Sequence, residues 1–350
     1  MPPFEEYASI LKRAWDKSWI TNNGELVQEL EAKLKDYLGV KHLLFTNNGT
    51  IVLQMALKAY NITGEVITTP FSYVATTNAL LWENCKPVFV DIDPSSFCID
   101  PERIEAAVTE KTQAIMATHV YGYPCAVEKI EAIAAKHNLK VIYDGAHTFG
   151  ARYKNKSLLS YGDISTCSFH ATKLFHTVEG GCIICHDEEM YQKLYLYRSF
   201  GHIGDDYYSI GVNGKNSEFH AAMGLAVLPS IPWLIDQRRN AAKLYTEYLA
   251  GTDISCPSPG KINDLEWNYS YWPVLFPSEE KLLLARNILL EKGFNTRRYF
   301  YPSLNTLPFF EDHQSCPVSE NISKRALALP MQHDLSAESI QQVCAVLKAL

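Results

Sequence analysis

Apolar and polar positions along the chain follow two periods, one typical of helices and one typical of buried strands. Near the start, Leu26, Leu30, Leu34 and Leu38 recur at helical spacing, and Gly39 then closes the pattern. After this helix, short apolar runs alternate with longer amphipathic runs. We expect strands at 42–46, 65–69, 87–91, 112–120 and 140–144, and helices at 50–60, 72–85, 102–109 and 127–138. This alternation predicts an α/β fold with a mostly parallel sheet that helices cover on both faces.

The pattern changes after residue 163. Two apolar runs, 163–170 and 181–186, are joined by a loop instead of a helix, so the sheet should become mixed there. A helical stretch then covers 217–249. It is interrupted near Pro229 and Pro232, because proline breaks helical hydrogen bonding. This stretch is the expected path out of the large domain.

The remaining elements predict a second, smaller unit. We expect a large cofactor-binding α/β domain at 1–235 and a small α+β domain at 236–350, with about the first 15 residues packing on the small domain. Within the small domain the pattern predicts strands at 269–276 and 294–300, a helix at 279–293 and a last helix from Ser336.

Composition restricts the classes of partner. Hydrophobic residues make up 47% of the chain and charged residues 20%, which is typical of globular proteins. No apolar run reaches the roughly 18 residues of a spanning helix, and the N-terminus lacks the basic start of a secretory signal. A formal net charge of −7 disfavours binding to a phosphate backbone. We therefore expect a cytoplasmic protein without a nucleic-acid or membrane partner.

The nine cysteines are scattered through apolar stretches, which is typical of reduced thiols in a core. Cys182, Cys185 and His186 match the attachment pattern of c-type haem and half of a zinc site. However, residues three apart in a strand face opposite sides, and no second Cys-x-x-Cys pair is present. We therefore expect these thiols to pack in the core and predict no metal site.

Polar residues gather where predicted strands end, which is the edge where open α/β sheets bind ligands. The segment Thr-Asn-Asn-Gly-Thr at 46–50 opens a helix, so free amides around Gly49, Thr50 and Ile51 could bind a phosphate. The same residues also form common helix-capping turns. Asp144 ends another strand and is either a capping residue or a carboxylate directed into the same cleft.

A lysine is usually a solvated surface group, but Lys173 follows a strand ending near Ser168 and precedes a Glu-Gly-Gly turn. An anion cradle, a strand-end carboxylate and a lysine are together what pyridoxal phosphate requires. The cofactor's aldehyde needs an amine, its pyridine nitrogen needs an anion, and its phosphate needs donors. A carboxylate about 4 Å from the pyridinium would stabilise it by several kcal/mol at an effective dielectric near 20.

The chain resembles a known family in eight segments, and the order and spacing of these segments also match. They are TNNGT, TPFSYVATTNA, the run 88–112, YDGAHTFGA, SFHATK, EGG, GVNGKNSEFHAAMGL and LALPMQHDLSAESI. With them the chain resembles, over nearly its whole length, the DegT family of sugar aminotransferases. These are fold-type I pyridoxal phosphate enzymes that act on nucleotide-linked keto sugars. The resemblance implies the aminotransferase-like arrangement of a large and a small domain.

The resemblance also implies roles for individual residues. Lys173 would bind the cofactor covalently and move the proton, and Asp144 would pair with the pyridinium. His147 would lie near the phenolic oxygen and Tyr73 would stack on the ring. Ser168, Gly49 and Thr50 would bind the phosphate, and Asn213 would reach the phosphate of the other subunit, which implies a homodimer with shared sites. The chain departs from the family at Val178, where glycine is frequent, and at Lys215, where arginine is frequent.

The substrate implied by the resemblance is a nucleoside-diphosphate keto sugar, most often linked to dTDP. The residues expected near the sugar or diphosphate are Arg198, His202, Lys215, Arg297, Arg298, Tyr299 and Tyr301. The amino donor would be L-glutamate, which converts the cofactor to pyridoxamine phosphate. The first choice of acceptor is dTDP-4-keto-6-deoxyglucose, and the alternative is its 3-keto isomer. The product would serve surface polysaccharides such as O-antigen, or antibiotic glycosylation. Two alternative hypotheses are a non-catalytic regulator that binds the cofactor and a structural protein without cofactor.

Overall fold

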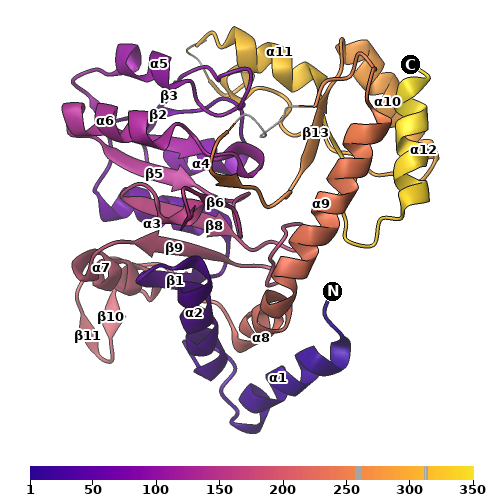
Figure 1. Ribbon diagram of the computed structural model, residues 1–350. Helices are drawn as coiled ribbons and strands as arrows, with labels where there is room; N and C mark the ends of the chain where they lie inside the picture. Colours follow the sequence, from indigo (N-terminus) through magenta and orange to yellow (C-terminus); the bar gives the residue numbers. More distant parts are fainter. Residues whose placement is uncertain (257–261, 311, 313) are drawn as a thin grey trace.

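A seven-stranded sheet forms the centre of the protein, in the order β1-β9-β8-β5-β4-β2-β3 (Figure 1). The computed structural model describes residues 1–256, 262–310, 312 and 314–350. The strands of the sheet are β1 (His42–Thr46), β2 (Glu65–Thr68), β3 (Lys86–Phe89), β4 (Thr112–Thr118), β5 (Lys140–Asp144), β8 (Ile164–Ser168) and β9 (Gly181–Cys185). Strand β9 pairs antiparallel with β1 and β8, and the other pairings are parallel. The prediction of a mostly parallel sheet that becomes mixed after residue 163 is confirmed.

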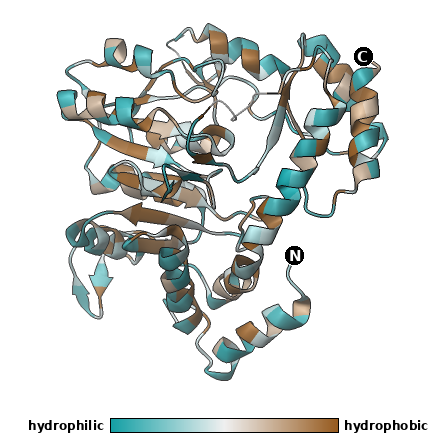
Figure 2. Ribbon diagram, in the orientation of Figure 1, coloured by the Kyte–Doolittle hydropathy of each residue, from teal (hydrophilic) through white to brown (hydrophobic). Residues whose placement is uncertain are grey.

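Helices cover both faces of this sheet because its strands are buried apolar runs. The covering helices are α2 (Glu25–Leu38), α3 (Gly49–Ala59), α4 (Val74–Trp82), α5 (Pro101–Ile104), α6 (Val127–His137), α7 (Glu188–Arg198) and α8 (Glu218–Val227). Figure 2 shows apolar strands in the sheet and polar residues on the outer sides of the helices. Gly39 ends α2 with a φ of 67°, as its position in the pattern predicted.

Strand β9 separates two apolar clusters. Cys182 belongs to the cluster that includes residues of α2 and α8, and Cys185 belongs to the cluster that includes residues of α3 and α7. Both thiols are buried and unoxidised. The two cysteines therefore face opposite sides of the sheet and pack in the core, as the period of a strand requires.

The C-terminal unit packs beside the carboxyl ends of the parallel strands. Its elements are α9 (Ile231–Tyr248), β13 (Trp272–Leu275), α10 (Glu279–Glu291), α11 (Pro317–Arg325), β14 (Ala326–Leu329) and α12 (Ala337–Lys348). Between α8 and α9 lies one 3₁₀ turn at Leu228–Ser230, so the expected break at the prolines is present. The strand expected at 294–300 is not formed, and Arg297 makes only a single bridge to Ala328. The domain boundary at 235 stays a prediction, since that residue lies inside α9.

The N-terminal helix and several two-residue strands lie outside these two groups of elements. They are α1 (Phe4–Asp16), β6 (Arg152–Tyr153), β7 (Lys156–Ser157), β10 (His202–Ile203), β11 (Asp206–Tyr207) and β12 (Leu265–Glu266). Helix α1 lies against α8, where Tyr7 donates to the Phe219 carbonyl at 3.5 Å (Figure 1). The first residues therefore pack on α8, and their packing on the small domain stays a prediction.

Within the described part of the chain, the helical stretch from Glu218 to Tyr248 is long and apolar enough to meet the criteria for a membrane span. Core helices can have the same length and apolar composition, and 56% of the most apolar part of this stretch is buried inside the protein. Most residues of α8 are buried, so we interpret the apolar part of the stretch as packed in the protein core.

Candidate active site

The carboxyl ends of β1, β5 and β8 meet the N-termini of α3 and α4 around one cavity of about 390 Å³. The cavity is lined by Asn48, Gly49, Thr50, Leu53, Ser72, Tyr73, Ala75, Asp144, Ala146, His147, Ser168, His170, Thr172, Lys173, Glu179, Tyr271, Arg297, Tyr299 and Phe300. The structure therefore brings together every cofactor residue expected from the sequence except Asn213. This convergence follows from the parallel sheet, whose strand ends share one edge.

Asp144 is a buried carboxylate with both oxygens anchored. Oδ2 accepts a hydrogen bond from the Thr76 hydroxyl at 2.7 Å, and Oδ1 accepts one from the Ala146 amide at 3.0 Å. Asp144 is only 6% exposed, so these donors offset part of the cost of burying a charge. A fixed anion at this position can hold a cation that enters the cavity.

Lys173 lies in a loop after β8 and contacts a residue from the C-terminal unit. Its Nζ donates to the Tyr271 hydroxyl at 3.1 Å and lies 5.7 Å from the centroid of that ring. Burial by itself lowers the pKa of Lys173, but Tyr271 and, to a smaller extent, Asp144 outweigh it, so the pKa is raised above the ordinary value. The amine is thus held as an ammonium ion, with the Tyr271 hydroxyl as its hydrogen-bond acceptor.

The Tyr271→Phe variant should move the pH midpoint at which Lys173 reacts with an amine-directed reagent to lower pH, because the hydrogen bond to the ammonium form is lost. The ring contacts of Tyr271 with His147 and Tyr299 do not involve the hydroxyl. Peptide mass spectrometry on the cofactor-free protein would measure the midpoint. Turnover should fall on the order of tenfold. Tyr269→Phe, which leaves the packing on Trp267 in place, is the control. Equal midpoints in the two variants would contradict the role of Tyr271.

The N-terminus of α3 faces the cavity beside Ser168. A Cβ added at Gly49 would lie 2.6 Å from the Ser168 Cβ, so only glycine allows this approach. The Asn48 side chain accepts from the Thr50 amide at 2.9 Å and the Ile51 amide at 2.8 Å. These two amides were expected to be free, but they are capped, because the asparagine side chain reaches them first. The Ser168 and Thr50 hydroxyls and the helix dipole remain as elements of an anion site.

His147 is buried beside Lys173 and is neutral. Burial and, secondarily, the Lys173 charge hold the pKa of His147 well below its ordinary value. Its Nδ1 accepts from the Tyr121 amide at 3.2 Å, so the ring proton lies on Nε2. The ring stacks on Phe300 at a centroid distance of 5.4 Å. His147 is therefore oriented as a hydrogen-bond donor through Nε2.

Val178 adopts the left-handed backbone conformation, with a φ of 68°, in the turn that carries Glu179 into the cavity wall. A left-handed L-residue costs roughly 1–2 kcal/mol, and a β-branched side chain is especially unsuited to it.

The Val178→Gly variant should raise the free energy of unfolding by about 1 kcal/mol, since relief of strain exceeds the added entropy of glycine in the unfolded chain. Chemical denaturation would measure it. Val108→Gly, at a valine with an ordinary φ of −73°, is the matched control and should destabilise the protein. A loss of stability in both variants would show that Val178 is not strained.

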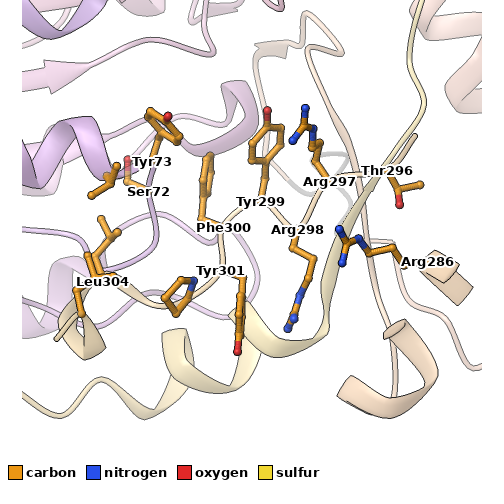
Figure 3. A pocket seen from close by; sticks show the side chains of 13 residues that line it. Ser72, Tyr73, Arg286, Thr296, Arg297, Arg298, Tyr299, Phe300, Tyr301 and Leu304 are labelled. Carbon is orange, nitrogen blue, oxygen red and sulfur yellow. The ribbon is translucent and has the colours of Figure 1, made fainter. Parts of the chain in front are cut away.

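The residues expected near the substrate divide into two groups. Arg297 and Tyr299 line both the cavity that holds Lys173 and an adjoining cavity of about 560 Å³, whereas Arg298 and Tyr301 line only the adjoining cavity. Figure 3 shows the Tyr299 ring between Tyr73 and Arg297, while the side chains of Arg298 and Tyr301 extend the opposite way. Arg298 donates to Glu279 at 2.6 Å and stacks on Tyr301. Arg297 and Tyr299 are therefore the better placed for contact with a substrate.

The other expected residues lie outside both cavity linings. Arg198 is 1% exposed and donates to Glu31 at 2.6 Å and to the Phe45 carbonyl at 2.9 Å, so it joins α7 to α2 and β1. His202 lies in the β10–β11 hairpin, which projects from the sheet edge (Figure 1). Asn213 and Lys215 lie on the segment after this hairpin. We do not propose that Arg198 binds the substrate, because its guanidinium is already paired in the core.

The sequence analysis named helix capping as an alternative for the segment that contains Asn48, but two further residues of the site, Thr76 and Tyr271, escaped it. Asn48 has a recognisable signal, since asparagine before a helix is a frequent cap. Thr76 lies within an apolar helix, and Tyr271 lies in a strand-like run 98 positions after Lys173. For the latter two no local pattern points to the cavity, because their contacts depend on how distant elements pack.

Comparisons with known proteins match one family over nearly the whole chain. The model of the DegT/DnrJ/EryC1/StrS aminotransferase family matches residues 4–348. A dTDP-4-amino-4,6-dideoxy-D-glucose transaminase of Shigella dysenteriae is 42% identical over 362 aligned positions, covering 100% of this chain and 97% of the relative. One of the same name from Escherichia coli is 38% identical, with coverage of 99% and 96%. The structure of DesI in the presence of its TDP-sugar product has a TM-score of 0.95 at 32% identity, with coverage of 100% and 90%.

Proposed function

The chain belongs to the DegT/DnrJ/EryC1/StrS aminotransferase family, and from this premise we propose that it uses pyridoxal phosphate to transfer an amino group from L-glutamate to dTDP-4-keto-6-deoxy-D-glucose. The product would be dTDP-4-amino-4,6-dideoxy-D-glucose. The observation that carries the proposal is the meeting of the Lys173 amine, the Asp144 carboxylate and the N-terminus of α3 around one cavity. Two relatives that match the whole chain bear the name of this activity.

The residues of the cavity fit the cofactor. Close approach of Ser168 to the α3 N-terminus, which requires the missing Cβ of Gly49, suits a phosphate. Asp144 suits the protonated pyridine nitrogen and Lys173 suits the aldehyde. When bound, pyridoxal phosphate would supply a carbonyl that accepts the amino group and a ring that withdraws electrons from the reacting carbon.

Each side chain then has a definite task. The Asp144 carboxylate holds a proton on the ring nitrogen through charge attraction. Lys173 moves a proton to and from the substrate carbon through Nζ. The Tyr271 hydroxyl fixes the direction of Nζ, and the Nε2–H of His147 is available as a donor. Arg297 and Tyr299, which line the cavity, would contact the substrate.

The test is a reaction of the purified protein with pyridoxal phosphate, L-glutamate and either dTDP-4-keto-6-deoxyglucose or its 3-keto isomer, with the products identified by mass and proton NMR spectra. We expect a yellow protein and a 4-amino product. A 3-amino product would keep the aminotransferase reaction and overturn the choice of sugar. A yellow protein without turnover would favour the alternative of a non-catalytic regulator that binds the cofactor. A colourless protein that does not bind added cofactor would refute the proposal.

We also propose that the enzyme is a homodimer with shared active sites. Six exposed hydrophobic side chains occur on the segment from 200 to 212, namely Phe200, Ile203, Tyr207, Tyr208, Ile210 and Val212. Contiguous exposed apolar groups of this kind are typical of protein interfaces. Asn213 follows directly, with its carbonyl bonded to Asn47 next to the α3 N-terminus. Sedimentation velocity should give a dimer, and Ile210→Asp with Tyr208→Asp should give a monomer.

The cytoplasmic location remains a prediction.

A further inference from the structure

Three buried hydroxyl groups form a chain that ends on Asp144. Thr118, at the end of β4, lies 3.1 Å from the Ser72 hydroxyl, and Ser72 lies 2.7 Å from the Thr76 hydroxyl. Thr76 contacts Asp144 Oδ2 at 2.7 Å. The three hydroxyl residues are at most 2% exposed. The chain thus joins strands β4 and β5 and the start of α4 beneath the cavity.

The carboxylate at the end of this chain of hydroxyl groups determines which group donates in each hydrogen bond. An ionised carboxylate can only accept hydrogen bonds, so Thr76 donates its single hydroxyl proton to Asp144. Thr76 must then accept from Ser72, and Ser72, having donated its own proton, must accept from Thr118. All three O–H groups therefore point toward the carboxylate, and aligned donors of this kind strengthen one another.

We propose that Thr76 is a positioning residue that holds the Asp144 carboxylate in one orientation, with Ser72 and Thr118 supporting Thr76. This inference rests on the proposed function, since it assigns the chain to the anion that would hold the pyridinium. The Ala146 amide anchors the other oxygen, so neither oxygen can rotate out of the cavity without losing a hydrogen bond.

The neighbouring residue supplies a matched control. Thr77 is as fully buried as Thr76, but its hydroxyl has no hydrogen-bond partner in the described structure. A change of threonine to valine preserves shape and removes only the hydroxyl. Thr76→Val therefore removes the bond to Asp144, Thr77→Val removes an unused hydroxyl on the same helix, and Thr76→Ser keeps the donor.

The first measurement is the affinity of the cofactor-free protein for pyridoxal phosphate at pH 7, by fluorescence titration. In Thr76→Val the affinity should fall about tenfold, as for the loss of one hydrogen bond to a charged group. Thr77→Val and Thr76→Ser should follow the unmodified protein. If Thr76→Val binds the cofactor as tightly as Thr77→Val, or Thr76→Ser fails to restore the affinity, the role of Thr76 is refuted.

A second measurement separates this inference from the proposed function. In cofactor-free protein with ¹³C-labelled aspartate, the Asp144 carboxyl signal is assigned by its loss in Asp144→Asn. Its chemical shift at pH 7 should change in Thr76→Val, because the carboxylate loses one donor, and remain in place in Thr77→Val. This change requires no cofactor. Failure of the unmodified protein to bind pyridoxal phosphate would refute the proposed function, whereas an unchanged chemical shift in Thr76→Val would refute the hydroxyl chain.

Discussion

The Lys173→Ala variant should lose at least about 10⁴-fold of its turnover, because the group that would bind the cofactor covalently and carry the proton is removed. Borohydride treatment of the unmodified enzyme should attach the cofactor permanently to the peptide that contains Lys173, and the variant should give no such peptide. Transfer from glutamate, followed by absorbance, measures the loss. The variant should still bind the cofactor, since Asp144 and the α3 N-terminus remain.

Two further variants separate the chemistry of the amine from its charge. Lys173→Arg keeps a cation near Tyr271 and Asp144, but arginine does not give up its proton, so this variant should be as inactive as Lys173→Ala. Lys58→Ala, at an exposed lysine of α3, should be fully active. Methylamine, which fits the space left by the side chain, should restore part of the activity of Lys173→Ala only. Normal glutamate conversion in Lys173→Ala would refute the assigned mechanism.

The Asp144→Asn variant should lose on the order of 10³-fold of its turnover. A carboxylate about 4 Å from a cation contributes about 4 kcal/mol at an effective dielectric near 20, and asparagine keeps the shape without the charge. Asparagine can still accept from Thr76, so the fold should be retained. Steady-state kinetics and a thermal melt of the same preparations would measure the two effects.

Asp91→Asn is the matched control for this loss. Asp91 also follows a buried strand, β3, but its carboxylate accepts from the backbone amides of Val318 and Ser319 and does not line the cavity. This variant should melt at lower temperature and keep kcat within about twofold of the unmodified enzyme. Equal losses of turnover in the two variants would show that Asp144 acts through folding and not through its charge at the cofactor.

Periodicity predicted most of the fold because it reports burial within a single element. The run 42–46 became β1 with five buried residues, and Leu26 to Leu38 became the buried side of α2. The prediction of a strand at 294–300 was wrong because side chains of this segment line cavities and its backbone does not pair continuously with a neighbouring strand. Arg297 and Tyr299 line both cavities, Arg298 lines only the adjoining one, and Arg297 makes a single bridge to β14.

The amino-acid sequence by itself determined that a mostly parallel sheet would place Gly49, Asp144 and Lys173 at one edge, since strand ends follow from local apolar patterns and parallel strands end together. Only the tertiary structure decided which groups meet these residues. Tyr271 comes to Lys173 from another unit, the Thr118–Ser72–Thr76 chain comes to Asp144 from two other elements, and Arg198 turns inward to Glu31. Such contacts depend on the packing of segments far apart in the chain, which no local period encodes.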